Sequence, residues 1–497
     1  MRSEKYLFRS HGLLVGGLGG GLAGLSLLNG EVFFMWIALA FLWSISGDLF
    51  GGFLWGFVAV LISHSWLLAL HPLSWIGIPG PLSLPIALMI WLFCGGLGGL
   101  LVGLWSWISN TPLFERMRDG FFGEKILFIV VLSSIWGLSE VLLASSPLFW
   151  IGVGGSALPS DRYLAGIARW IGEGGLATVQ LLIGSWLWQI GIAVRRGIGW
   201  KRLFSFGLFF FLLVHLVGAS LLPKKSFSEA IPVALWQSDI PIRTKFSEEQ
   251  QNRIPYALNE SFERAKNLSA SWLVAPEGIL GSNQELLFPA PIPLLSGGFR
   301  WVRGAQRSAV LVFQKGERKS AKALDKHRLV PLGEKVPDSL PLFKNGGLSA
   351  VGGLEAGSPS RLLSWSGPPV AVAICYELSD GKLLAEAVNS GAKWLLTVAN
   401  LDPYPISLQR QFLALAQLRS IETSRDLISV ANTGPSVLIK ASGEVKPIID
   451  PFIEATELAE LHLHSNISGY TRWKEMPLIS IFLLSFSALI MMRFCSN

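Results

Sequence analysis

Residues 369–377 form an apolar run that ends in reactive side chains. They read Pro369-Val370-Ala371-Val372-Ala373-Ile374-Cys375-Tyr376-Glu377. Five small or β-branched apolar residues in a row predict a buried strand, because a strand covered on both faces needs no polar alternation. Cys375 then stands at the strand tip, before a helix predicted to begin near Ser379. Backbone N–H groups there favour a thiolate, although a lone cysteine in an apolar run is more often a core residue.

The composition is typical of a membrane protein. Only 15% of the 497 residues are charged, against about 25% in soluble domains, and the mean hydropathy is +0.48. The 20 tryptophans fit membrane–water interfaces. The formal net charge is +7, but much of the basic excess lies in short loops between apolar segments, so we expect no nucleic acid partner. The cysteines Cys94, Cys375 and Cys495 contain no CxxC pair and predict no disulfide framework.

Apolar segments near membrane-spanning length divide the chain. We expect spans at 12–29, 31–46, 50–70, 84–108, 125–145, 175–194, 203–221 and 478–492. The first is rich in glycine, which favours close helix–helix approach in lipid, and the second is the shortest. The sequence therefore predicts a membrane domain at 1–221, an α/β domain at 222–474 and a C-terminal transmembrane helix at 477–494.

The distribution of basic residues predicts the orientation. Lys and Arg cluster before span one, between spans four and five, and between spans six and seven, at Arg2, Lys5, Arg9, Arg116, Arg118, Lys125, Arg195, Arg196, Lys201 and Arg202. By the positive-inside rule these loops and the N-terminus are cytoplasmic. Seven crossings then place 222–474 outside, and the eighth returns the C-terminus to the cytoplasm. His64 and Glu140, within or at the ends of spans, either serve function or pair with a neighbour.

Residues 222–474 alternate between strand and helix patterns. Apolar strands are expected at 233–235, 272–275, 310–313, 370–374, 394–398, 427–430 and 437–439. Helical patterns cover 379–390 and 407–424. A capping box at Ser247 begins another helix, which Pro255 is expected to kink or end. The segment 338–368 is rich in Gly, Ser and Pro and predicts a long loop, of the kind that often forms a lid over a site.

Reactive side chains follow three of these predicted strands. Glu277 comes after 272–276, Lys326 opens the segment 326–334, which ends in Glu334, and Cys375 ends the strand described first. A carboxylate, an ammonium and a thiol suffice for acyl transfer. The carboxylate takes the thiol proton, the thiolate attacks a carbonyl, and the ammonium stabilises the oxyanion. Taken singly, Glu277 and Lys326 are more often solvated surface residues, so the prediction depends on the combination.

These motifs resemble the nitrilase superfamily, and the whole layout is similar to the bacterial apolipoprotein N-acyltransferase family. The motif Lys-x-x-Leu-Val-Pro-x-Gly-Glu at 326–334 is highly specific to that family. Other matching segments are 275–277 and 374–377 and, more weakly, 236–241, 432–434, Gly443, 52–56 and 164–166. The resemblance covers essentially the whole chain and implies about eight spans plus an α-β-β-α sandwich domain.

The sequence also departs from the family pattern. Gly278 stands where the family commonly has a small hydroxyl residue or alanine, and 401–404 reads Leu-Asp-Pro-Tyr where an Asp and then a Trp are usual. The second change puts acyl-chain or acceptor preference in question. Neither change removes one of the three reactive residues.

The resemblance implies roles for six residues. Glu277 would be the general base, Lys326 the oxyanion stabiliser and Cys375 the nucleophile that forms a thioester. Glu334 would orient Lys326 or assist proton transfer. Tyr376 and Glu377 would support the site beside the nucleophile.

The implied reaction completes lipoprotein maturation in the bacterial inner membrane. A phospholipid donates an acyl chain to Cys375, and the α-amine of the N-terminal diacylglyceryl-cysteine of an apolipoprotein accepts it. The resemblance implies no metal and no organic cofactor. A membrane-tethered carbon–nitrogen hydrolase (an amidase or nitrilase) and an inactive lipoprotein-binding protein remain as alternatives. Eight spans and the motif at 326–334 favour the acyltransferase over the hydrolase.

Overall fold

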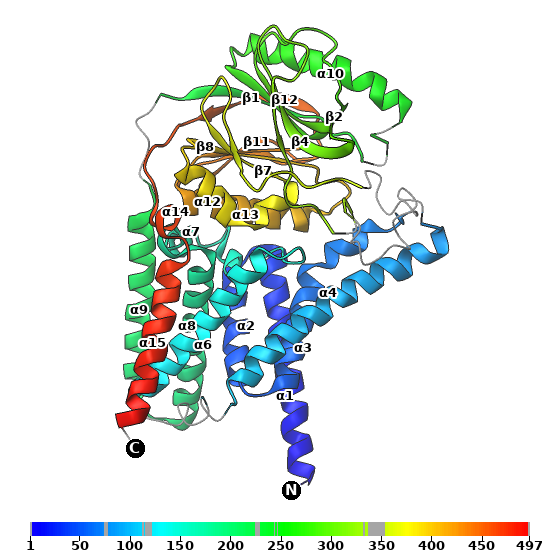
Figure 1. Ribbon diagram of the computed structural model, residues 1–497. Helices are drawn as coiled ribbons and strands as arrows, with labels where there is room; N and C mark the ends of the chain where they lie inside the picture. Colours follow the sequence, from blue (N-terminus) through cyan, green and yellow to red (C-terminus); the bar gives the residue numbers. More distant parts are fainter. Residues whose placement is uncertain are drawn as a thin grey trace. The chain divides into compact units, whose positions relative to one another are not determined.

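The chain folds into two compact units. The helical unit comprises Met1–Leu68, Pro85–Leu221 and Trp473–Asn497, and the sandwich unit comprises Ala69–Leu84 and Leu222–Arg472 (Figure 1). This computed structural model describes residues 2–73, 78–111, 114, 122–223, 229–242, 244–245, 247–331, 333–335 and 353–495.

Apolar helices build the helical unit. They are α1 (Arg2–Asn29), α2 (Val32–Ser44), α3 (Leu49–Ser63), α4 (Gly80–Ile108), α6 (Phe122–Ala144), α8 (Ala168–Arg196), α9 (Trp200–Leu221) and α15 (Met476–Cys495). Among the described residues, α1 from His11, α4, α6, α8 and α9 are long and apolar enough to cross a membrane. The helices α2, α3 and α15 are shorter apolar helices. Each predicted span therefore corresponds to a helix.

The third and sixth predicted spans differ from the structure by more than small shifts of their ends. The third was predicted to reach residue 70, but α3 ends at Ser63 and the 3₁₀ helix η1 (Ser65–Leu70) follows. The sixth was predicted to begin at residue 175, but α8 begins at Ala168 and is broken at Gly172, where φ is +65°. Between α6 and α8 lie the short helices η3 (Gly155–Ala157) and α7 (Arg162–Ala165).

Glycines let helices α1 and α3 touch through their backbones. A methyl group on Gly16 would lie 2.3 Å from the Gly51 carbonyl oxygen, and one on Gly20 would lie 2.3 Å from the Trp55 carbonyl oxygen. The predicted close approach of the first span is confirmed, because any larger side chain at these positions would force the helices apart.

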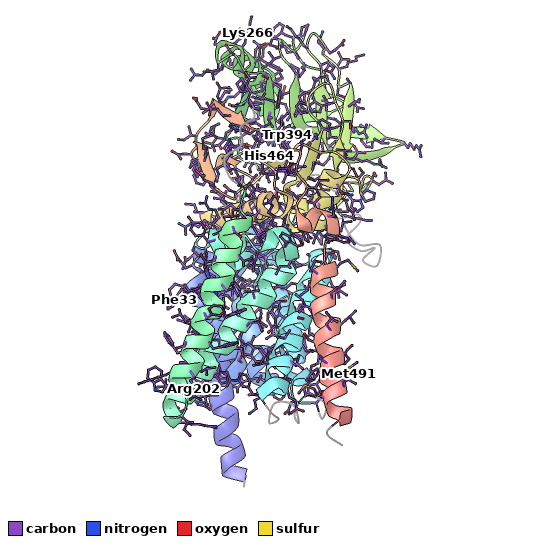
Figure 2. The ribbon with its side chains drawn as sticks, turned by 90° about the vertical axis from the view of Figure 1, so that its left-hand side faces the viewer. Phe33, Arg202, Lys266, Trp394, His464 and Met491 are labelled. Carbon is purple, nitrogen blue, oxygen red and sulfur yellow. The ribbon has the colours of Figure 1, made fainter. Side chains whose placement is uncertain are left out.

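Tryptophans occupy the core of the helical unit as well as its surface. The indole of Trp43 donates to the Leu181 carbonyl at 2.9 Å, and that of Trp105 to the Leu132 carbonyl at 3.0 Å. Both are almost fully buried. The interfacial interpretation is therefore wrong for them, because packing and a hydrogen-bonded N–H hold each ring inside the protein. Phe33, by contrast, points outward from α2 and is 60% exposed (Figure 2), as expected of a side chain in contact with lipid.

The ionisable groups in the helices pair with neighbours. The Glu140 carboxylate accepts hydrogen bonds from the Trp136 indole at 2.8 Å and from the backbone N–H groups of Val153 at 2.6 Å and Gly154 at 3.0 Å. His64 Nδ1 lies 2.9 Å from the Ser63 hydroxyl oxygen. Glu140 thus fixes the loop after α6, which supports the pairing alternative for this residue.

Two six-stranded sheets build the sandwich unit. The first contains, in order, β12 (Ala455–Leu461), β1 (Ile231–Gln237), β2 (Trp272–Ser282), β3 (Leu294–Val302), β4 (Ala305–Phe313) and β5 (Lys322–Asp325). The second contains β6 (Leu362–Leu363), β7 (Val370–Ile374), β8 (Trp394–Ala399), β9 (Leu427–Ala431), β10 (Ser436–Ile439) and β11 (Val445–Ile449). The pairs β1–β2, β2–β3, β7–β8 and β8–β9 are parallel, and the others are antiparallel.

Alternating side chains divide the sandwich unit into layers. In β1, Val233 and Leu235 pack with β7 and β8 residues between the sheets, whereas Ala234 and Trp236 pack against α10 (Glu248–Asn267). The helices α12 (Gly381–Asn389) and α13 (Ile406–Thr423) cover the outer face of the second sheet (Figure 1). The predicted α-β-β-α sandwich is confirmed, because α10 covers the outer face of the first sheet and α12 and α13 cover that of the second. The helix α14 (Gly469–Trp473) follows the last strand.

Some local predictions for this unit were wrong. Pro255 does not end the helix, since α10 runs through it from the Ser247 N-cap, whose hydroxyl accepts the Gln250 N–H at 3.3 Å. The strands β3, β5, β11 and β12 were not predicted. Within the predicted loop 338–368, residues 338–352 lie outside the described residues, and Leu362–Leu363 forms β6.

Candidate active site

Lys326 is the centre of a buried charge cluster. It directly follows β5, is 1% exposed, and its Nζ donates to Glu277 Oε1 at 2.9 Å and to Glu334 Oε1 at 2.7 Å. Burial alone would lower the pKa of Lys326, but the two carboxylates outweigh burial and hold that pKa well above its ordinary value. Lys326 therefore carries a fixed positive charge between two carboxylates.

Glu277 occupies an irregular part of β2. The prediction that it ends the strand was wrong, because β2 continues to Ser282. The register of β2 against β3 shifts between Ala275 and Leu280, which bulges the backbone at Glu277. Gly297 of β3 lies directly against this bulge, since a methyl group there would be 2.4 Å from Glu277 Cα. The carboxylate is thereby turned toward Lys326.

Cys375 begins the 3₁₀ helix η4 (Cys375–Ser379) immediately after β7. Its φ of +51° is unusual for a residue with a side chain and marks a sharp turn. The Asn400 N–H donates to Glu277 Oε2 at 3.0 Å and also forms a hydrogen bond with Cys375. The thiol and the Glu277 carboxylate therefore share one donor and are neighbours.

The resting state of Cys375 differs from the prediction of a favoured thiolate. Burial raises the pKa of the thiol far above its ordinary value, and the Glu277 carboxylate raises it further. Lys326 and the Asn400 N–H lower the pKa but do not compensate. The thiol thus stays protonated until a neighbouring base removes its proton. A helix-end effect of the kind predicted is too small to offset burial beside carboxylates.

Glu334 and Glu377 support this cluster in different ways. Glu334 contacts Lys326 directly, and its Oε2 accepts the Val330 N–H at 2.8 Å, which closes the turn of the 326–334 motif. Burial raises the pKa of Glu334, while Lys326 lowers it. Glu377 does not contact Lys326 or Cys375 through its side chain in any hydrogen bond found among the described residues.

Glu377 instead fixes the backbone on either side. Its carboxylate accepts the N–H of His327 at 2.7 Å, next to Lys326, and the N–H of Ile374 at 2.8 Å, next to Cys375. Arg361 Nη1 donates to both carboxylate oxygens, at 2.8 and 2.9 Å. The Glu377–Arg361 ion pair is almost fully buried and holds the two reactive segments in register.

Tyr376 packs beneath Arg328. The guanidinium carbon lies 4.5 Å from the Tyr376 ring centroid, and Arg328 Nη2 lies 3.4 Å from the Tyr376 hydroxyl oxygen. This cation–π contact joins the residue after the nucleophile to the 326–334 motif. All six predicted residues therefore belong to one connected group, with Glu277, Lys326 and Glu334 in direct side-chain contact.

Several residues of this group escaped prediction. Asn400 acts through its backbone, which no side-chain pattern reports. Arg361 lies in the segment predicted as a loop. The Tyr404 hydroxyl is within electrostatic reach of Cys375 and Glu334; burial, followed by these two groups, raises the pKa of the phenol. The only signal for Tyr404 was its place in the departure at 401–404.

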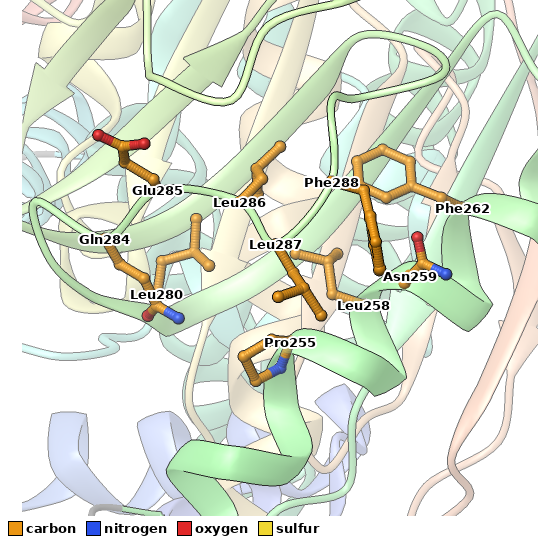
Figure 3. A pocket seen from close by; sticks show the side chains of 10 residues that line it. All are labelled: Pro255, Leu258, Asn259, Phe262, Leu280, Gln284, Glu285, Leu286, Leu287 and Phe288. Carbon is orange, nitrogen blue, oxygen red and sulfur yellow. The ribbon is translucent and has the colours of Figure 1, made fainter.

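A separate apolar pocket lies between α10 and residues 284–288. Figure 3 shows Leu258 and Phe262 of α10 facing Leu286 and Phe288 across it. None of the six predicted residues lines it. Over the described part of the chain, no group of three or more His, Cys, Asp or Glu residues could hold a metal ion.

Solved structures and curated relatives resemble the chain to different degrees. Nit3 of Saccharomyces cerevisiae, from branch 10 of the nitrilase superfamily, matches 48% of this chain and 92% of its own, at 15% identity and a TM-score of 0.37. An amidase of Nesterenkonia from the same superfamily gives 14% identity over 52% of this chain and 98% of its own, also with a TM-score of 0.37. No protein-family profile matches.

Curated relatives match nearly the full length. A protein of Prochlorococcus marinus (strain MIT 9313) is 58% identical over 96% of this chain and 95% of its own. One from a second strain of Prochlorococcus marinus is 54% identical over 97% of each. One of Parasynechococcus marenigrum (strain WH8102) is 50% identical over 93% of this chain and 97% of its own. All three are named apolipoprotein N-acyltransferase, and this chain belongs to the apolipoprotein N-acyltransferase family.

Proposed function

We propose that the protein transfers a fatty acyl chain from a membrane phospholipid, through a thioester on Cys375, to the α-amine of an apolipoprotein's N-terminal diacylglyceryl-cysteine. The observation that carries the proposal is the buried cluster in which Lys326 bridges Glu277 and Glu334. It stands beside a thiol that shares the Asn400 N–H with Glu277. Nucleophile, base and oxyanion stabiliser are thus neighbours, as acyl transfer requires.

The first half-reaction forms the thioester. Glu277 takes the Cys375 proton as the sulfur attacks the ester carbonyl carbon of the phospholipid. This coupling is needed because the thiol, whose pKa is raised, is protonated at rest. Lys326 stabilises the tetrahedral oxyanion. The carbon–oxygen bond to glycerol then breaks, the alkoxide takes the proton from Glu277, and a lysophospholipid leaves.

The second half-reaction forms the amide. The α-amine of the apolipoprotein attacks the thioester carbonyl carbon, and Glu277 accepts a proton from the nitrogen. Lys326 again stabilises the oxyanion. The carbon–sulfur bond breaks, and the sulfur recovers its proton from Glu277. Cys375 returns to the thiol, so the cycle consumes one phospholipid and one apolipoprotein, releases a lysophospholipid and the acylated apolipoprotein, and needs no further reagent.

The proposal includes a place in the cell. The apolar helices support a multi-pass protein of the bacterial inner membrane. The basic residues between α8 and α9, Arg195 and Arg196 among them, support cytoplasmic termini with residues 222–474 on the extracytoplasmic side.

The experiment is intact-mass analysis of the protein purified from membranes and incubated with mixed bacterial phospholipids. We expect a mass increase of one acyl chain, removed by hydroxylamine, in the wild type and in a Cys94→Ser control. Cys375→Ala should show no adduct. Absence of an adduct on the wild type would overturn the proposal in favour of the hydrolase or the inactive binding protein.

A further inference from the structure

A second buried lysine lies on the other side of Glu277. Lys245, in the turn before α10, is 1% exposed, and its Nζ donates to the Glu277 backbone carbonyl at 2.9 Å. The next residue, Gly278, has a φ of +65°, and a methyl group on it would lie 3.5 Å from Lys245 Nζ. The ammonium therefore clamps the peptide that links Glu277 to Gly278. The reaction derived above leaves this lysine unused.

The turn that carries Lys245 is itself firmly held. The Lys245 carbonyl accepts the Gln251 side-chain amide at 2.8 Å. The Ile242 N–H donates to Asp402 Oδ2 at 2.8 Å. Upstream, Asn432 accepts the Ile240 N–H at 3.0 Å. Hydrogen bonds of Ile242 and of the Lys245 carbonyl therefore help to hold Lys245 beside the Glu277 carbonyl.

The charges around Lys245 come from three elements. Glu277 of β2 and Asp402 of the loop after β8 are the anions that act on it, and Asp239, after β1, faces Asp402. Lys326 stands beyond Glu277. Burial lowers the pKa of Lys245 to about 8, although Glu277 and Asp402 oppose the shift. Unlike Lys326, this lysine loses its proton just above neutral pH.

We propose that Lys245 is a positioning residue that orients Glu277 through its backbone carbonyl and compensates the negative charge of the Glu277–Cys375 pair. When Cys375 becomes a thiolate beside the Glu277 carboxylate, two anions stand together, and a nearby ammonium stabilises them. The inference rests on the proposed function for the roles of Glu277 and Cys375. It adds a pH-sensitive charge to the site.

The test measures alkylation of Cys375 by iodoacetamide between pH 6 and 10, a reaction that needs no lipid substrate. Every protein in this comparison carries Cys94→Ser and Cys495→Ser, so that Cys375 is the only thiol. Here the wild type is the protein that has these two changes and keeps Lys245. In the wild type the rise of the rate with pH should flatten near pH 8, where Lys245 deprotonates. Lys245→Met should react about tenfold more slowly below pH 8, as expected for a one-unit pKa change. It should also lose the inflection at pH 8.

Lys245→Arg should retain the charge, and its rate should rise without flattening. Lys319→Met removes a lysine that is 77% exposed and should leave the profile unchanged. Superimposable profiles for wild type and Lys245→Met would overturn the inference. If Lys245→Met fails to fold, the wild type is compared with Lys245→Arg instead. A wild-type rate that rises without flattening near pH 8, as expected for Lys245→Arg, would overturn the inference.

Thioester formation with phospholipid is measured on the same proteins. A wild type that forms no thioester contradicts the proposed function, whatever its alkylation profile. A wild type that forms the thioester while Lys245→Met alkylates identically contradicts only the role of Lys245. The two failures are thereby distinguishable.

Discussion

The backbone N–H of Asn400 donates to Glu277 Oε2 at 3.0 Å and connects the two sheets of the sandwich. Asn400 follows β8 of one sheet, and Glu277 lies in β2 of the other. The remaining oxygen, Oε1, accepts from Lys326. The carboxylate therefore has a donor on each oxygen, which fixes its orientation toward Cys375.

Replacing Glu277 by Gln tests its proposed role as the base. The amide can still accept one of the two hydrogen bonds, so we expect the protein to fold. Thioester formation should slow by about 10²–10⁴-fold, the usual contribution of a general base. Single-turnover acylation followed by intact mass measures this. Glu355→Gln, an exposed carboxylate beside Arg307, serves as the control. An unimpaired Glu277→Gln would exclude Glu277 as the base.

Replacing Lys326 by Met removes the proposed oxyanion stabiliser. It also leaves Glu277 and Glu334 as adjacent carboxylates without their shared cation. We expect acylation to slow by about 10²–10³-fold and the melting temperature to fall. The double variant Lys326→Met/Glu334→Gln has the same net charge as the wild-type cluster, and it should recover part of the melting temperature but none of the activity. Recovery of activity in the double variant would contradict a direct role of the ammonium.

The buried pair of Glu377 and Arg361 should matter for stability as well as rate. Glu377→Ala leaves the Arg361 guanidinium uncompensated and frees the N–H groups of His327 and Ile374. Breaking such a pair costs about 3–5 kcal/mol. Thermal unfolding in detergent should show a large drop in melting temperature. Arg253→Ala, which breaks the exposed pair with Glu454, should have little effect. Equal effects of the two variants would show that the Glu377 pair does not hold the site.

The lowered pKa of Asp426 predicts that part of the protein's stability is lost at acid pH. Burial opposes ionisation, but His464 and Lys440 outweigh it and lower the pKa of Asp426 below its ordinary 3.8. Its stabilising contribution is therefore present above about pH 4 and is lost as the pH falls through the lower folded-state pKa. Asp426→Asn should lower the melting temperature at pH 7, and the difference from wild type should shrink below pH 4. A constant difference across this range would contradict the shifted pKa.

The proposed orientation predicts which positions an impermeant maleimide reaches in spheroplasts. A single cysteine at position 319, in the sandwich unit, should be labelled directly. One at position 196, at the end of α8, should be labelled only after the membrane is permeabilised. The positive-inside rule is the physical reason. The opposite labelling pattern would invert the proposed topology.

The sequence predicted the elements whose patterns are local. Apolar length located the membrane helices, and runs such as 370–374 located the central strands, because burial on both faces leaves a continuous apolar signal. The strands β11 and β12 were missed since their exposed polar residues, such as Lys446 and Glu460, interrupt that signal. The prediction that Pro255 could end its helix was wrong because a helix packed against a sheet can lose one backbone hydrogen bond and continue.

The reactive residues of the site were predictable, but much of its support was not. Glu277, Lys326 and Cys375 stand in recognisable motifs. Lys245 and Arg361 have no motif, and their importance comes from burial and from partners distant in sequence. The protonated state of Cys375 also depends on tertiary burial. A pattern read along the chain cannot report how far the fold excludes water.

The two sheets of the sandwich unit share one pattern of strand pairing. Read from β12 and from β6, both sheets pass through one antiparallel, two parallel and two antiparallel pairings. Glu277 belongs to the third strand of one sheet, and Asn400 follows the third strand of the other, so their hydrogen bond joins equivalent strands. The two sheets differ in their reactive side chains, because the first supplies the Glu277 carboxylate and the second is followed by the Cys375 thiol. The site therefore needs both sheets, because Glu277 lies in β2 of one and Cys375 directly follows β7 of the other.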